Sequence, residues 1–135
     1  MNIDNIQTYI NKLEKYYDSS CKPSPEELVQ LKQQKLPNSY LKFIEKFGFG
    51  VILSDILYIW SKPENTNLVY SNNINLKNLT TFGENTSGEM LAFNLNNTDD
   101  SVYEINSSGT IIKEYKSFYA FITEYLEYII EIENL

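Results

Sequence analysis

Residues 36–53 read LPNSYLKFIEKFGFGVIL, and a helix and a strand meet within them. Their apolar positions recur at three- and four-residue spacing, which is typical of one face of an amphipathic helix: Tyr40, Leu41, Phe43, Ile44 and Phe47. Pro37 cannot continue a preceding helix, and Gly48 is the residue type that commonly follows a helix end. The stretch therefore predicts a helix that begins near Asn38 and is followed directly by β-type sequence.

Upstream of this stretch, two further helices are predicted. Apolar residues at helical spacing from Ile3 to Tyr17 indicate an amphipathic helix over about residues 3–18, and a loop follows over residues 19–23. Ser24 can cap the next helix, Pro25 suits its first position, and Glu27 completes a capping box. This second helix is expected to run to about residue 34.

Downstream of Gly48, short β-type runs alternate with turn residues. Strands are predicted over residues 51–53, 56–60, 80–82, 89–95, 101–105 and 110–115. Residues 61–71, which include Pro63, are interpreted as a loop, and the short strand at 80–82 is expected to end at Gly83. Turns rich in Asn, Asp and Gly separate the last three strands and favour antiparallel hairpins.

A last helix is predicted after Ser117, which can cap it, and its apolar stripe runs from Phe118 to Ile130. The order of elements predicts an α+β fold, with N-terminal helices, a mainly antiparallel sheet and a closing C-terminal helix. A chain of 135 residues fits one domain, expected to span residues 1–135.

The charge of the chain is uneven. The net charge is −7, and the basic residues are all lysines. Residues 1–83 carry a net +1, whereas residues 84–135 carry a net −8. Nucleic acid is excluded as an expected partner, because binding it requires cations against the phosphates. An acidic region suits a basic protein partner, and the alternative is that the charge serves solubility alone.

The residues that most catalytic and metal sites need are missing. The chain has no His, and Cys21 is its one cysteine, so it has no Cys/His metal set, no Ser–His pair and no internal disulfide. The glycines of residues 83–88 have the spacing of a phosphate loop, but Glu89 stands where its lysine is required, which favours a turn. Glu84 and Glu89 could act as an acid and base pair, although solvated surface carboxylates are the commoner case. We expect no cofactor and no enzyme activity.

The sequence also indicates where the protein acts. Its N-terminus has neither the basic nor the apolar region of a secretory signal. The longest apolar run, residues 56–60, is much shorter than the roughly 20 residues needed to span a bilayer. We expect a cytoplasmic protein that does not bind a membrane.

Several ordered motifs resemble one family. They are Leu36-Pro37-Asn38-Ser39-Tyr40-Leu41-Lys42-Phe43-Ile44, Phe47-Gly48-Phe49-Gly50, Phe82-Gly83, Gly88-Glu89-Met90-Leu91-Ala92-Phe93, Val102-Tyr103 and Ser117-Phe118-Tyr119-Ala120-Phe121-Ile122. Over about residues 24–130 this pattern is similar to the SUKH superfamily, the SMI/KNR-type bacterial immunity proteins and cell-wall-assembly regulators. Family members usually carry Asn-Gly-Gly where this chain has residues 47–50.

The resemblance implies a strongly curved sheet flanked by helices and a binding role, most often the neutralisation of a cognate toxin. Many such toxins are nucleases and therefore basic, which the acidic region would suit. A regulatory scaffold of the cell-wall branch is the alternative. A small enzyme or ligand-binding protein, with Glu84 or Glu89 in its site, is a third.

Under the immunity hypothesis, exposed acids and aromatic residues near the sheet are expected to bind the partner. The candidates are Asp55, Trp60, Glu64, Glu84, Glu89, Asp99, Asp100, Tyr103 and Glu104. Packing in the core is the competing interpretation for Trp60, and plain solvation for each acid.

Overall fold

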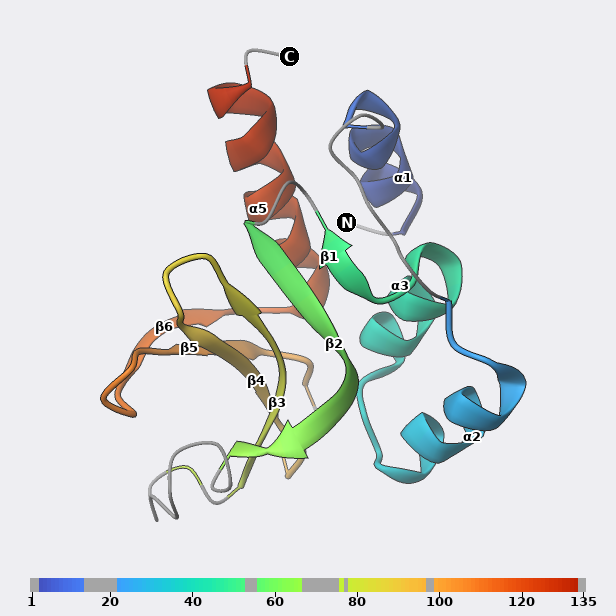
Figure 1. Cartoon of the computed structure of the whole chain (residues 1–135), viewed down its shortest axis with the longest axis vertical. Helices are drawn as coiled ribbons and strands as arrows, with labels where there is room; N and C mark the ends of the chain where they lie inside the picture. The colour runs from blue at the N-terminus through green and yellow to red at the C-terminus, as the bar shows by residue number, and fades with distance from the viewer. Residues whose placement is uncertain are drawn as a thin grey trace.

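The computed structural model describes residues 3–13, 22–52, 56–66, 76, 78–96 and 99–133. The elements follow in the order α1 (Ile3–Lys12), α2 (Pro25–Gln33), α3 (Asn38–Phe47), β1 (Gly50–Ile52), β2 (Leu57–Asn65), β3 (Leu79–Asn85), β4 (Met90–Asn94), β5 (Val102–Ile105), β6 (Ile111–Tyr115) and α5 (Phe118–Ile132). Figure 1 shows a curved sheet with α5 running behind it and α1 to α3 grouped beside β1 and β2. The predicted α+β order of helices, antiparallel sheet and closing helix is confirmed.

The sheet of the described residues is a meander. Its six strands lie in chain order, β1-β2-β3-β4-β5-β6, and every neighbouring pair is antiparallel. The ladders are irregular at three points: between Ile59 and Glu64, between Thr81 and Gly83, and between Glu104 and Ile105. Such irregularities bend a strand and increase its twist, which accounts for the curvature of the sheet.

Local capping fixes the helix starts as the sequence predicts. The Ser24 hydroxyl accepts from the Glu27 N–H, and the Glu27 carboxylate accepts from the Ser24 N–H, which completes the capping box. The Ser117 hydroxyl caps α5 by accepting from the Ala120 N–H. Residues 14–18 of the predicted first helix lie outside the described residues, as does Cys21.

Two predicted boundaries are wrong. Residues 61–65 form the second half of β2 rather than a loop, and Pro63 is buried within it. Pro63 is tolerated there because the β2–β3 ladder is irregular between Ile59 and Glu64, so no regular ladder hydrogen bond is lost. Strand β3 also runs through Gly83 to Asn85. A Cβ at Gly83 would lie 2.5 Å from the Tyr58 carbonyl oxygen, so glycine allows two strands to approach closely.

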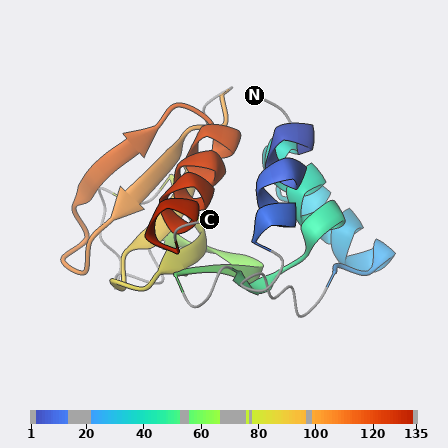
Figure 2. The same ribbon diagram turned by 90° about the horizontal axis from the view of Figure 1, so that it is seen from above.

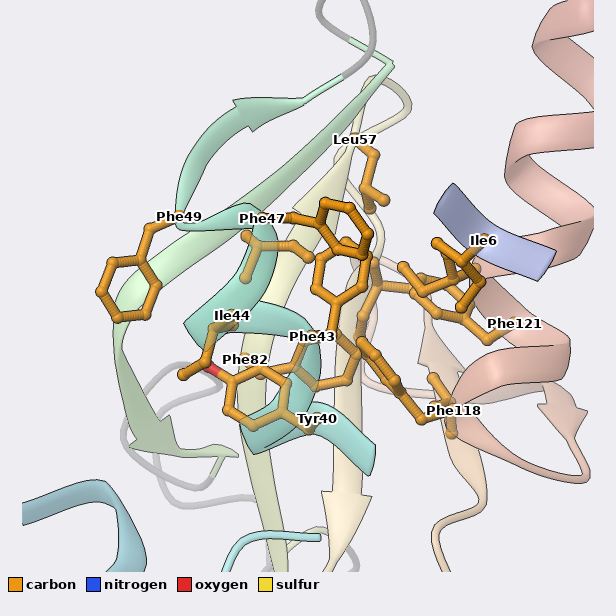
Figure 3. Close-up of a cluster of buried hydrophobic side chains, with 14 of the residues drawn as sticks. Ile6, Tyr40, Phe43, Ile44, Phe47, Phe49, Leu57, Phe82, Phe118 and Phe121 are labelled. Carbon is orange, nitrogen blue, oxygen red and sulfur yellow. The ribbon is translucent and has the colours of Figure 1, made fainter. Parts of the chain in front are cut away.

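The main core lies between α5 and the concave face of the sheet. Figure 3 shows Tyr40, Phe43, Phe82, Phe118 and Phe121 gathered at its centre. The Tyr40 and Phe118 rings pack edge to face with centroids 5.7 Å apart. A second buried cluster, which includes Leu79, Ala92 and Ile105, lies on the opposite face of the sheet. Successive residues of β4 therefore alternate between two covered faces.

Candidate functional site

A polar network lies where the β3–β4 hairpin meets α5. The Asn85 side-chain oxygen accepts from the Ser87 and Glu89 N–H groups, both at 3.0 Å, and shapes the hairpin turn. Its side-chain nitrogen donates to a carboxylate oxygen of Glu89 at 2.9 Å and to Glu104 Oε1 at 2.9 Å, and it lies 3.1 Å from the Tyr125 hydroxyl. One amide thus connects the hairpin, β5 and α5.

Glu104 is the buried centre of this network, with 7% of its surface exposed. Its carboxylate also accepts from the hydroxyls of Tyr115 at 3.2 Å and Tyr125 at 3.4 Å. Burial raises the pKa of Glu104, and the charge of Glu89 raises it further, while the Tyr115 hydrogen bond opposes the shift. Burial likewise raises the pKa of Tyr125 to about 12, so this hydroxyl stays a neutral donor.

Two hollows adjoin the network and share Tyr125 and Tyr128. One, of about 440 Å³, is lined by Tyr115, Glu124, Tyr125, Glu127, Tyr128 and Glu131. The other, of about 340 Å³, is lined by Ile56, Asn85, Thr86, Ser87, Tyr125 and Tyr128. We call the two together the tyrosine groove. Figure 2 shows its surroundings: α5 lies above the strands, with the hairpins on one side and α1 on the other.

Of the predicted partner-binding residues, the structure brings Glu89 and Glu104 together through Asn85. The expectation that Glu104 is an exposed acid is wrong. Glu104 lies opposite Leu91 on β4, and Leu91 packs in the core beneath α5, so directly opposed side chains place Glu104 on that face too.

Glu84 and Tyr103 lie on the other face of the sheet. Glu84 is opposite Met90, and both Met90 and Tyr103 pack against the second core cluster. Glu84 and Glu89 therefore do not form the acid and base pair that the sequence left open. The carboxylate that approaches Glu89 belongs to Glu104, fifteen residues along the chain.

Asp99 and Asp100 lie at a third place, near the start of α3. Asp100 is a structural residue there: its carboxylate accepts from the Ser39 hydroxyl at 2.6 Å and from the Phe118 N–H at 3.2 Å. Asp99 is exposed and accepts from the Ser101 N–H at 3.3 Å. Asp100 thus ties the beginnings of α3 and α5 to the β4–β5 connection.

The other candidates lie on or near β2. Trp60 is half-buried and Glu64 is exposed, so neither is a full member of the core. Asp55 lies outside the described residues. The nine candidates are therefore distributed over several surfaces rather than one.

Sequence reasoning missed the residues that shape the groove. Tyr115 ends a predicted strand, Tyr125 belongs to the predicted apolar stripe of the last helix, and Asn85 lies in a predicted turn. Tyr128 is 54% exposed although it follows Tyr125 on a strongly apolar helix. The signal in the sequence was the alternation of Tyr with Glu124, Glu127 and Glu131, which places aromatic and acidic side chains on neighbouring parts of one helix.

Neither a metal centre nor a membrane span appears in the described part of the chain. No group of three or more His, Cys, Asp or Glu side chains there could hold a metal ion. No helix there is long and apolar enough to cross a bilayer.

A family model described as "SUKH_6: SMI1-KNR4 cell-wall" matches residues 26–122. No curated protein and no solved structure matches the chain. The matched residues include α2 from its second residue, α3, the whole sheet and the first turn of α5.

Proposed function

We propose, on the premise that this chain belongs to the SUKH_6 family of SMI1-KNR4 proteins, that it is a bacterial immunity-type protein. In this role it binds a cognate toxin domain in the cytoplasm and neutralises it by protein–protein contact. Family membership carries the proposal, because the resemblance to SUKH proteins implies a binding role. The whole chain, residues 1–135, is taken as one binding domain.

The charge of the chain supports a basic partner. Residues 84–135 carry a net −8, and they supply most of the acids around the network and the groove. Opposite charge speeds encounter and disfavours acidic partners. Neutralisation by steric cover needs no reaction chemistry from this chain, in keeping with its lack of His.

The deciding experiment has two steps. The tagged full chain is used to capture proteins from its native lysate at low and moderate salt, and the bound proteins are identified by mass spectrometry. Each captured domain is then expressed alone and together with this chain. We expect a basic domain that stops growth alone, is tolerated when co-expressed, and is released by salt. A captured domain that stays toxic beside this chain would contradict the proposal.

A regulatory scaffold is the second candidate function, because the description of the matching family includes the words "cell-wall". Capture of cell-envelope or housekeeping proteins, none of them toxic when expressed alone, would favour the scaffold.

A further inference from the structure

The tyrosine groove has aromatic walls and an acidic rim. Tyr125 and Tyr128 line both of its hollows, and Tyr128 keeps more than half of its surface exposed. The carboxylates of Glu124, Glu127 and Glu131 line the larger hollow. A surface of aromatic rings beside carboxylates is chemically suited to a cation that also has a flat apolar face.

The chain already places one cation in such a setting. The Lys113 ammonium lies 4.6 Å from the centroid of the Tyr115 ring and 2.7 Å from the Glu124 carboxylate. Lys113 therefore supplies the cation at one end of the groove. At the other end, Glu131 lies beside Tyr128 and has no paired lysine among the residues that the structure describes.

The position of these acids on α5 costs helix stability. The C-terminal end of a helix carries a partial negative charge, which favours cations there and disfavours carboxylates. The last turn of α5 has no basic residue, while Glu131 lies near that end. A cation from outside the chain would compensate both the carboxylate and the helix end.

We propose that the tyrosine groove receives an arginine side chain from the surface of the basic toxin, with its guanidinium stacked on Tyr128 and paired with Glu131. This inference rests on the proposed function and names the chemistry of the partner. Arginine is favoured over lysine because its guanidinium is planar, stacks on aromatic faces, is weakly hydrated and pairs with carboxylates through two parallel hydrogen bonds.

The first test uses hexa-arginine and hexa-lysine peptides as probes of the full chain. Binding is followed by backbone amide shifts in a ¹H–¹⁵N spectrum. We expect hexa-arginine to shift amides of α5 around Tyr128 and of the hairpin around Thr86, and to bind more tightly than hexa-lysine. Shifts spread evenly over the acidic surface, or equal affinities for the two peptides, would overturn the arginine site.

Matched variants separate a specific site from general charge. Tyr128→Ala and Glu131→Gln are expected to weaken hexa-arginine binding about tenfold, whereas Tyr128→Phe keeps the ring and stays within about twofold. Tyr58→Ala and Glu45→Gln are the controls, because Tyr58 is an exposed tyrosine on β2 and Glu45 is an exposed acid on α3. Thermal melting of each variant checks its fold. Equal weakening by variants and controls would contradict the proposal.

The two proposals fail in different ways. A captured toxin that Tyr128→Ala and Glu131→Gln still neutralise at wild-type level would disprove the groove and leave the immunity function standing. Hexa-arginine bound at Tyr128, with no toxin neutralised, would support the groove and disprove the immunity function.

Discussion

Asn85 and Glu104 lie nineteen residues apart in the chain, and the Asn85 side-chain nitrogen donates to the Glu104 carboxylate at 2.9 Å. The acceptor is buried and has a second carboxylate, Glu89, on the same donor. This arrangement keeps an acid close to another acid inside the fold, and it makes folding stability depend on pH.

The pKa of Glu104 is raised above its ordinary value near 4.5, first by burial and then by the Glu89 charge. The folded state therefore holds a proton that the unfolded state releases, so the free energy of unfolding falls as pH rises from about 4.5 through the raised pKa. We expect Glu104→Gln to flatten this fall, measured by thermal melting from pH 4 to pH 8. Glu64→Gln is the exposed control, and an unchanged slope in Glu104→Gln would contradict the assignment.

Tyr40 carries a buried hydroxyl with no hydrogen-bond partner among the described residues, and its ring packs against Phe82, Phe93 and Phe118. Because an unsatisfied buried hydroxyl costs free energy, Tyr40→Phe should leave stability unchanged or raise it by about 1 kcal/mol. Tyr115→Phe, which removes a bonded hydroxyl, should lower stability by about 1 kcal/mol. Denaturant titration of both variants measures the two changes in stability. A clear loss of stability in Tyr40→Phe would mean that the Tyr40 hydroxyl has a hydrogen-bond partner.

Substitutions at two glycines separate the effect of a steric clash on stability from the effect of backbone conformation. Gly83→Ala places a Cβ 2.5 Å from the Tyr58 carbonyl oxygen and should cost about 2–3 kcal/mol through displacement of β2. Gly88→Ala meets no atom within 4 Å but has φ +80°, and it should cost about 1 kcal/mol. The midpoints of urea unfolding give the comparison. A larger loss of stability in Gly88→Ala than in Gly83→Ala would contradict this order. It would mean that β2 and β3 can move apart at little cost in free energy.

Asp100 and Asp99 are adjacent acids with different roles. Asp100→Ala removes the acceptor for the Ser39 hydroxyl and the Phe118 N–H, and it should lower stability by about 2–3 kcal/mol. Asp99→Ala should cost less than about 1 kcal/mol, since Asp99 is exposed and accepts one N–H. Melting temperatures of the two variants, measured at one pH, test whether Asp100→Ala destabilises the protein more than Asp99→Ala. Equal effects would argue against Asp100 as the link between α3 and α5.

Helix α1 lies outside the family match, yet Ile6 and Ile10 belong to the main core. Ile6 is fully buried, so Ile6→Ala should cost about 2–5 kcal/mol. Val29→Ala is the control, because Val29 is 55% exposed and should change stability by less than about 0.5 kcal/mol. Calorimetry of both variants tests whether residues before 26 are an integral part of the domain. An Ile6→Ala variant as stable as wild type would place α1 outside the cooperative unit.

Interactions between residues close together in the sequence were predictable, and interactions between residues far apart in the sequence were not. The Ser24 box and the Ser117 cap involve residues three apart, so the local pattern contains the whole interaction. The Asn85 network depends on the β4–β5 register and on how α5 crosses the sheet, which no local pattern specifies. For the same reason Glu104 appeared as an ordinary strand acid, and Pro63 as the mark of a loop.

The central place of α5 has a consequence for synthesis on the ribosome. Phe118 and Phe121 occupy the middle of the aromatic core, and Tyr9 of α1 donates to Glu127 at 2.9 Å. The sheet and the first three helices are translated before α5, so their apolar faces remain uncovered until residues 118–132 have left the exit tunnel. The nascent chain therefore exposes apolar surface before the core closes, and surface of this kind is what chaperones protect.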